Sequence, residues 1–353
     1  MNEKDFVDLH VHDQFSYLDG AVKTDKLVEL TAKLGRKYLA QTNHANMDGM
    51  VRFNKACIEN DVKPIFGCEL YFRKNLDKLD KRERGYHLTV QAKSMKGLQS
   101  IFRGLSKAHT VWNGFRPYLP LDYPLENFED VVIMSGCASS PFWNLNEDSE
   151  GFKLLDKYVE KFKEDFYFEI MPLTDWQGQR PINEMALEGA RQTGRKVVLT
   201  NDIHFLTKSD SELHEAILCV STHGTWNNPK RFKFGTKQNH VRNLTETVAA
   251  MADLGYEEDL IIPALTNTRE VAEKCYFPLQ RIPVSLPPVL PEGTDEKKWM
   301  VQRCIGELRR LGLENDKYLD RLDTELQAVF KGKFERYFLL VADVVGWAKR
   351  NGI

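Results

Sequence analysis

The chain has 353 residues, with 49 Lys and Arg against 51 Asp and Glu, so its formal net charge is −2. A near-neutral chain has no overall cationic field, so a nucleic-acid partner would have to be met by local basic patches. Its six cysteines form no CxxC pair, its start is polar and acidic, and its apolar runs are short. These features argue against a disulfide framework, a signal peptide and a membrane span of about 18 residues, and they favour the cytoplasm.

Short apolar runs typical of strands alternate with helical patterns up to about residue 205. The predicted strands lie near residues 6–12, 38–42, 64–72, 87–92, 131–136, 166–171 and 196–202. The predicted helices between them lie near 24–34, 47–60, 95–108, 150–164 and 182–193. This alternation indicates parallel βα units. We therefore predict an α/β fold with a closed or nearly closed barrel, although an open doubly wound sheet has the same rhythm.

The rhythm changes after residue 205, where residues 209–221 and 244–254 favour helices. A proline-rich stretch from Pro278 to Pro291 then predicts an extended linker, because proline is excluded from helix interiors and central strands. We place the domain boundary here, with one domain over residues 1–278 and the linker and a second, mainly helical and incomplete domain over 279–353. Helices are predicted near 295–312 and 316–330, followed by an amphipathic, apolar segment over 337–353.

The first predicted strand carries two histidines, His10 and His12, two positions apart. Side chains at i and i+2 of a strand point to the same face, so the two imidazoles stand side by side. Imidazole is the commonest metal ligand in proteins, which makes the pair a candidate for half of a metal site. A surface strand with two histidines is the plainer interpretation of this pair alone.

Other ligand-type side chains stand at or near the ends of the remaining strands. Parallel strands gather such residues at one edge of the sheet. His87 is a partial exception, because it opens its predicted strand. The full set is His10, His12, Asp19, His44, Glu69, His87, Cys137, Asp202 and His204.

Imidazole, carboxylate and thiol groups are typical ligands of zinc, manganese or iron. Nine such groups exceed what one ion needs, so we expect two or three divalent ions, bridged by a carboxylate such as Glu69. Ions about 3.5–4 Å apart activate a water molecule and stabilise the leaving oxygen in phosphoester hydrolysis. A thiol nucleophile at Cys137 is an alternative, but it leaves the histidines without a role. The remaining histidines, 109, 214, 223 and 240, are interpreted as structural or solvent-facing.

The run from Phe6 to His12, continued by Phe15 to Gly20, resembles the opening motif of the PHP (polymerase and histidinol phosphatase) domain. It is most similar to the PHP domain of the bacterial DNA polymerase III alpha subunit, a C-family polymerase. The similarity continues through five further motifs, at residues 42–44, 67–69, 87–89, 135–140 and 200–204. Residues 337–353 resemble the segment in which the palm domain of that polymerase begins.

The resemblance implies a distorted seven-stranded βα barrel with up to three metal ions, held by the nine residues named above. It implies that these residues act through the bound metals in a 3′→5′ exonuclease that removes misincorporated nucleotides. The palm's glycine-rich segment and catalytic D-x-D aspartates are not in the sequence, so we expect a shortened or split chain that does not itself polymerise DNA.

The expected partners are single-stranded or primer-template DNA and the remainder of the polymerase, on the same or a second polypeptide. A proofreading exonuclease subunit and a sliding clamp are further partners that the resemblance implies. Two basic patches are candidate DNA contacts, since DNA-facing surfaces are cationic and single strands stack on aromatic rings. They consist of Arg73, Lys74, Lys81 and Arg82, and of Lys230, Arg231 and Phe232.

Two other functions fit parts of the sequence. One is a stand-alone PHP phosphatase that acts on a small phosphate monoester, although the polymerase-like segment after residue 205 argues against it. The other is a scaffold in which the metals only stabilise the barrel, for the polymerase or a proofreading subunit.

Overall fold

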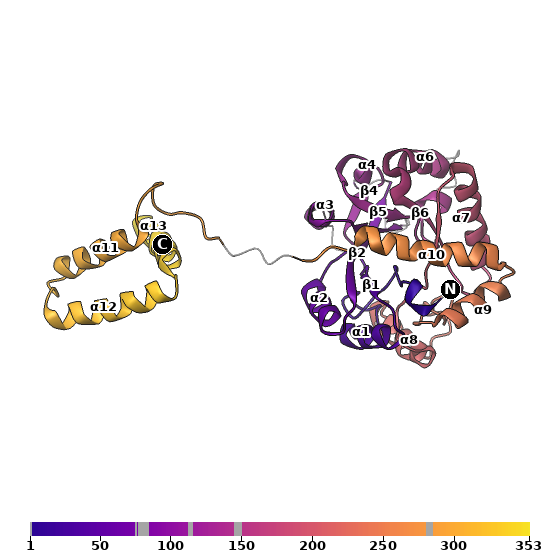
Figure 1. The fold of residues 1–353 in the computed structure, drawn as a ribbon, viewed down its shortest axis with the longest axis horizontal. Coiled ribbons are helices and arrows are strands. Elements are labelled where there is room, and N and C mark those ends of the chain that lie inside the picture. Colours follow the sequence, from indigo (N-terminus) through magenta and orange to yellow (C-terminus); the bar gives the residue numbers. More distant parts are fainter. Residues whose placement is uncertain (1, 75, 77–84, 112–115, 145–149, 280–284) are drawn as a thin grey trace. The chain divides into compact units, whose positions relative to one another are not determined.

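The computed structural model describes residues 2–74, 76, 85–111, 116–144, 150–279 and 285–353. The chain divides into two compact units, residues 1–279 and residues 280–353, and each is described by itself. Figure 1 shows the first as a sheet surrounded by helices and the second as a helical unit. Within the described ranges, no helix is long and apolar enough to cross a membrane.

The first unit is built on a seven-stranded sheet with the order β1-β2-β3-β5-β6-β7, in which β4 also pairs with β2. The strands are β1 (Tyr38–Gln41), β2 (Lys63–Arg73), β3 (Tyr86–Ala92), β4 (Tyr118–Pro120), β5 (Val131–Met134), β6 (Phe166–Ile170) and β7 (Val197–Leu199). The predicted α/β class is confirmed, whereas the short strand β4 was not predicted.

The helices that follow or separate these strands account for most of the predicted helical segments. Helices α2, α3 and α7 contact strands β2, β3 and β6 respectively. The helices of this unit are α1 (Thr24–Lys33), α2 (Met50–Glu59), α3 (Met95–Thr110), α4 (Tyr123–Asn127), α5 (Pro141–Asn144), α6 (Glu150–Phe162), α7 (Gln179–Thr193), α8 (Ser211–Ser221), α9 (Leu244–Asp253) and α10 (Glu258–Cys275).

Strand β3 runs antiparallel to both of its neighbours, β2 and β5. The expectation of parallel strands throughout was therefore wrong at this strand. The segment 74–85 that joins β2 to β3 is short, and an antiparallel pair needs no crossover helix. Because β3 is reversed, its beginning, with His87, lies beside the end of β2, where Tyr71 is paired with His87.

The segment 6–12 closes the sheet, although it is not a regular strand as predicted. On one side Asp8 and Val11 accept hydrogen bonds from the backbone of β1 and the residue after it, at 3.0 Å each. On the other side His12 donates to the carbonyl oxygen of Ile203, beyond β7, at 2.7 Å. The amide of Val11 donates instead to the hydroxyl of Thr42, which interrupts the ladder. The curled sheet thus forms a distorted, closed barrel.

Helix α10, which was not predicted, packs across the end of the barrel where the strands begin. Asn267 donates a hydrogen bond to the carbonyl oxygen of Val197, the first residue of β7. The hydroxyl of Thr268 accepts one from the amide of Val7. Val271 and Cys275 of this helix join the interior apolar cluster of the barrel. One end of the barrel is therefore filled, and the opposite end carries the polar residues.

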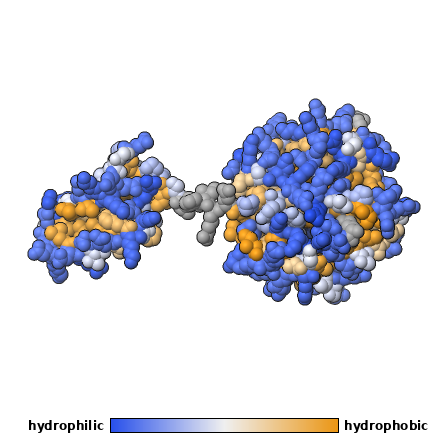
Figure 2. All heavy atoms as spheres, in the orientation of Figure 1, coloured by the Kyte–Doolittle hydropathy of each residue, from blue (hydrophilic) through white to orange (hydrophobic). Residues whose placement is uncertain are grey.

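Residues 280–353 form a unit of three helices, α11 (Glu296–Arg310), α12 (Asp316–Lys331) and α13 (Glu335–Arg350). Its small core is made by Met300, Leu326 and Leu339. As expected from the amphipathic segment, α13 exposes large apolar side chains, including Phe338, Val344 and Trp347. Figure 2 shows apolar surface on this unit.

A buried guanidinium ties the start of the chain to the barrel. The Arg36 side chain is fully buried, pairs with Asp8 and Glu3, and donates to the carbonyl oxygen of Arg242. Its guanidinium also lies 4.4 Å from the centre of the Phe6 ring. The neighbouring Lys37 forms an exposed pair with Asp61.

We expect Arg36→Met to lower the free energy of unfolding by about 3–5 kcal/mol, because it leaves the buried Asp8 carboxylate without its cation. Lys37→Met, the control one residue away, removes an exposed ion pair and should cost less than about 1 kcal/mol. Urea unfolding of the full chain followed by circular dichroism measures both. Equal losses in the two variants would contradict this role of Arg36.

Candidate metal centre

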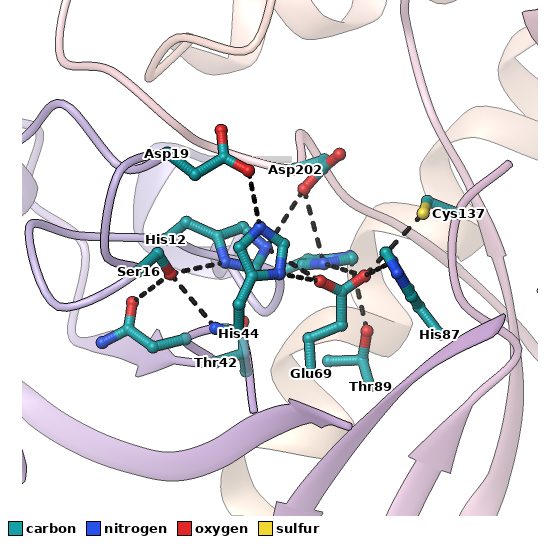
Figure 3. Close-up of polar contacts among 12 residues, drawn as sticks. His12, Ser16, Asp19, Thr42, His44, Glu69, His87, Thr89, Cys137 and Asp202 are labelled. Atoms are coloured by element: carbon teal, nitrogen blue, oxygen red, sulfur yellow. Dashed lines mark hydrogen bonds and ion pairs between the residues drawn. The ribbon is translucent and has the colours of Figure 1, made fainter. Parts of the chain in front are cut away.

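All nine candidate ligands converge at the open end of the barrel. His10, His12 and Asp19 come from the first segment and the loop after it, and His44 follows β1. Glu69 lies in β2 and His87 in β3, Cys137 follows β5, and Asp202 and His204 follow β7. Figure 3 shows the Glu69 carboxylate among these side chains, with Asp202 on one side and Cys137 beyond His87.

Glu69 lies at the centre of the cluster. Its Oε1 is 3.6 Å from His10 Nε2 and 3.1 Å from His87 Nδ1. Its Oε2 is 3.7 Å from His12 Nε2 and 2.5 Å from His44 Nδ1. A single buried carboxylate thus reaches four imidazoles, which is the position a bridging ligand needs.

Asp202 faces the first histidine pair. Its Oδ1 lies 3.4 Å from both His10 Nε2 and His12 Nε2. Two ligands at 2.0–2.2 Å from one tetrahedral ion lie roughly 3.3–3.6 Å apart, so these distances fit a shared cation. Asp202 has a φ of 47°, in the left-handed region that a non-glycine residue rarely adopts. Such backbone strain persists where the surrounding structure enforces it, often at functional sites.

Asp19 contacts a further set of histidines, and it lies on the side of the His44 ring opposite Glu69. Its Oδ2 is 3.0 Å from His44 Nε2, and its Oδ1 is 2.9 Å from His214 Nε2 and 3.8 Å from His204 Nε2. His214, on α8, was interpreted as structural or solvent-facing, but it is buried and contacts the cluster. His214 could not be found among ligand-type residues at strand ends, because it reaches the site from a helix.

Unpaired buried atoms test whether the residues fit a metal. Among the residues that the structure describes, six atoms of this cluster are buried and have no hydrogen-bond partner. They are His10 Nε2, His12 Nε2, His44 Nδ1, Glu69 Oε2, Asp202 Oδ1 and His204 Nε2. Buried polar atoms normally make hydrogen bonds, whereas these six contact one another only as ion pairs, such as His44 Nδ1 with Glu69 Oε2, so their lone pairs fit divalent cations.

The described residues contain four groups whose ligand atoms lie within 4.8 Å of one another. Three of them share residues and involve the first segment and the end of β7. The fourth joins Glu69, His87 and Cys137. The groups are His10–His12–Asp202, His12–His44–His204, Asp19–His204–His214 and Glu69–His87–Cys137.

Three histidines are oriented by partners on their other ring nitrogen. His10 Nδ1 lies 2.7 Å from Glu169 Oε1, and His12 Nδ1 lies 3.0 Å from the Ser16 hydroxyl. His204 Nδ1 lies 2.9 Å from the carbonyl oxygen of Asp202. With Nδ1 engaged, each ring presents Nε2 to the cluster, as metal-binding histidines do. Glu169 was not among the predicted site residues. A carboxylate within an otherwise apolar, wholly buried strand is the feature that could have revealed it.

Burial and neighbouring carboxylates pull the histidines in opposite directions. Burial lowers the pKa of His12 to about 3, helped by His44 and His204, so this imidazole is neutral and can donate a lone pair. Burial also disfavours charge on His44, but Glu69 and Asp19 outweigh it and raise its pKa to about 9.

The carboxylates stay ionised although they are buried. Burial alone would raise the pKa of Asp19, Glu69 and Asp202, yet the neighbouring histidines hold all three pKa values below the usual range. The three ionised carboxylates give the site an excess of negative charge, and they favour the protonated form of imidazoles such as His44. A bound cation balances that negative charge without the protons.

Gly136 brings Cys137 to the cluster. Its φ of 81° suits glycine, and a Cβ at this position would lie 2.8 Å from the carbonyl oxygen of His87. Only glycine therefore lets the turn after β5 approach the start of β3. Cys137 Sγ consequently lies 3.8 Å from Glu69 Oε1.

The two described residues of the first basic patch, Arg73 and Lys74, are both engaged within the domain. Arg73 is buried, with its guanidinium 4.1 Å from the centre of the Tyr118 ring. Lys74 pairs with Glu150 at 2.8 Å. Lys81 and Arg82 lie outside the described residues.

The second patch is divided. Arg231 has a buried side chain, paired with Glu215 and stacked on Trp226, so it supports the loop rather than facing a ligand. Lys230 and Phe232 are exposed. Phe232 also lines a cavity of about 400 Å³ that opens above the ligand cluster.

We expect Glu169→Gln to weaken zinc binding about 10- to 100-fold, because a neutral amide holds the His10 ring less firmly. Glu188→Gln, on the exposed side of α7, is the control and should bind zinc as the unchanged chain does. Competition with a chromophoric chelator measures both affinities. Equal affinity in all three proteins would rule out this positioning role.

Comparison with known proteins identifies two family matches along the chain. The PHP domain family matches residues 8–172, and the bacterial DNA polymerase III alpha NTPase domain matches residues 298–353. The DNA polymerase III subunit alpha of Treponema pallidum is 28% identical over 365 residues, covering 100% of this chain and 30% of that protein. The subunit of Escherichia coli is 31% identical over 372 residues, covering 100% and 31%.

A solved structure from Bifidobacterium adolescentis, described as a metal-dependent phosphoesterase, is 15% identical, with a TM-score of 0.40. The match covers 56% of this chain and 87% of that one. The chain spans about 30% of the length of the curated relatives it matches. The chain is thus similar to the PHP domain family over residues 8–172 and to the bacterial DNA polymerase III alpha family over residues 298–353.

Proposed function

We propose that the PHP domain is a metal-dependent phosphodiesterase that removes nucleotides from the 3′ end of DNA. The proposal assigns the barrel to residues 1–278, and the linker and the beginning of the palm to residues 279–353. It places the chain's activity within bacterial DNA replication, in the cytoplasm.

The observation that carries the proposal is the cluster of six buried atoms, Glu69 Oε2 among them, that make no hydrogen bond and carry lone pairs a cation could accept. The nine proposed ligands are all of ligand-competent type, and seven of them, all except His10 and His12, line a cavity of about 400 Å³. A site that only stabilised the barrel would not need such a cavity above its ligands. Phe232 and Lys233 line its wall, and an aromatic ring beside a cation suits single-stranded DNA better than it suits a small phosphate monoester.

We propose two or three divalent ions, zinc, manganese or iron, held by the nine residues. Bound there, the ions would supply Lewis-acid chemistry, activating water and offsetting charge at the phosphate. The chain's own residues prepare the site. Glu169, Ser16 and the Asp202 carbonyl hold the Nδ1 side of His10, His12 and His204, so that each Nε2 is oriented before metal binds.

The proposed partners follow from the relatives named DNA polymerase III subunit alpha. They are single-stranded or primer-template DNA and the remainder of the polymerase. A proofreading exonuclease subunit and a sliding clamp are proposed as further partners. Lys230 and Phe232 remain the proposed DNA contacts from the basic patches, because both are exposed.

The test incubates the full chain, loaded with manganese or zinc, with a 5′-labelled single-stranded oligonucleotide. We expect a ladder of products shortened from the 3′ end. His12→Ala removes a ligand of two candidate groups and should lower the rate about 100-fold or more, as loss of a charge-stabilising group does. Metal quantification on each protein establishes that the ions are bound.

His223→Asn is the matched control, since His223 is exposed outside the cluster and asparagine tolerates its φ of 54°. It should cleave at the unchanged rate. Absence of cleavage by the metal-loaded protein would contradict the proposed nuclease activity. Turnover of an aryl phosphate without DNA cleavage would instead indicate a phosphatase, and a lower Tm of His12→Ala without any activity would indicate a scaffold.

A further inference from the structure

Two loops above the metal centre are joined into one wall. Asp175, in the loop after β6, accepts hydrogen bonds from the Thr236 hydroxyl and, at 2.8 Å, from the Lys237 amide. Gln238 accepts from the Thr174 amide at 2.9 Å and donates to the Thr174 hydroxyl, also at 2.9 Å. The side chains that these loops carry are therefore held in place relative to one another.

Trp176 is confined in this wall by two glycines. A Cβ on Gly178 would lie 2.4 Å from Trp176 Cζ2, and a Cβ on Gly235 would lie 2.9 Å from its Cδ1 and Nε1. Only residues without a side chain leave room for the indole there. Trp176 also lines the cavity, so the fold positions a flat aromatic surface beside the ligand cluster.

Phe234 and Phe232 extend the aromatic wall along the second loop. The Phe234 ring is edge-on to His204, with centres 5.2 Å apart, and 4.9 Å from His214. Phe232 lies 6.3 Å from Phe234 and is 54% exposed. One end of the wall thus touches a proposed metal ligand, and the other reaches solvent.

Two cations line the same cavity. Lys233 lies between the two phenylalanines in the sequence, and Arg116 lies 4.9 Å from the centre of the Tyr71 ring. Tyr71 in turn packs 4.5 Å from His87, a member of the cluster. An anionic, aromatic ligand therefore matches the cavity, since it is lined by proposed metal ligands, aromatic rings and positive charge.

We propose that Trp176, Phe232 and Phe234 stack on the base of the 3′-terminal nucleotide and so select an unpaired end. The inference rests on the proposed nuclease function and names its substrate. A cavity of about 400 Å³ is at the small end of ligand sites and takes one nucleotide. A paired terminal base must first leave its duplex to enter, which costs least at a mismatch or on a single strand.

The test compares two oligonucleotides that differ only at the 3′ end, one with a terminal thymine and one with a terminal abasic sugar. We expect the unchanged chain to favour the thymine end roughly 10-fold or more, the range that base–aromatic stacking gives per base. Trp176→Ala should remove most of this preference, measured as the ratio of the thymine rate to the abasic rate within each protein. Trp176→Phe should retain most of it.

Trp347→Ala is the control, because Trp347 is exposed on α13 in the second unit and does not line the cavity. It should keep the full preference. Equal rates for the two ends in the unchanged chain, or a preference that survives Trp176→Ala, would overturn the inference while leaving the nuclease intact.

A binding measurement separates the two proposals. Fluorescence anisotropy gives the Kd of each oligonucleotide when its last linkage is a phosphorothioate, which slows hydrolysis. We expect the thymine end to bind roughly 10-fold more tightly, and Trp176→Ala to equalise the two affinities. Equal Kd values in the unchanged chain refute base stacking even if no oligonucleotide is cleaved, whereas absence of cleavage alone refutes only the nuclease.

Discussion

The buried carboxylate of Glu69 is the constraint on which the rest of the site depends. It lies within 3.7 Å of four imidazoles, and burial would make its charge costly without them. The four imidazoles reach it from three parts of the chain, namely segment 6–12, the residues after β1, and β3, so closing the barrel also assembles the site. Charges removed from water need partners, and here the partners are groups that themselves bind cations.

The barrel satisfies this constraint by filling one end with α10 and leaving the other end polar. The segment 6–12 bonds to both β1 and the residues after β7, which sets His10 and His12 opposite Asp202. Glu169 and Ser16 then fix the ring orientations from outside the cluster. Loops on this open end are free to carry other chemistry, and two of them build the aromatic wall around Trp176.

Much of the fold and most of the candidate ligands could be read from local pattern. Short apolar runs located β1, β2, β3, β5, β6 and β7, and ligand-type residues at strand ends pointed to one edge. Helix α10 was missed, and Pro263 inside it argues locally against a helix. Segment 6–12 has the alternating apolar and polar residues of a strand but lacks the regular backbone hydrogen bonds of one, because the amides of Val7 and Val11 donate to threonine hydroxyls. Arg73 and Arg231 looked like surface cations, yet both are engaged within the domain.

By itself the sequence determined the residue types of the site, the α/β class and the similarity to PHP domains, because strand periodicity and motif spacing are local properties. Only the tertiary structure decided the direction of β3, which brings His87 to the same edge as the other ligands. It alone revealed His214, Glu169 and the confinement of Trp176 between Gly178 and Gly235. These contacts join residues distant in the chain, and their distances and burial depend on packing that no local pattern records.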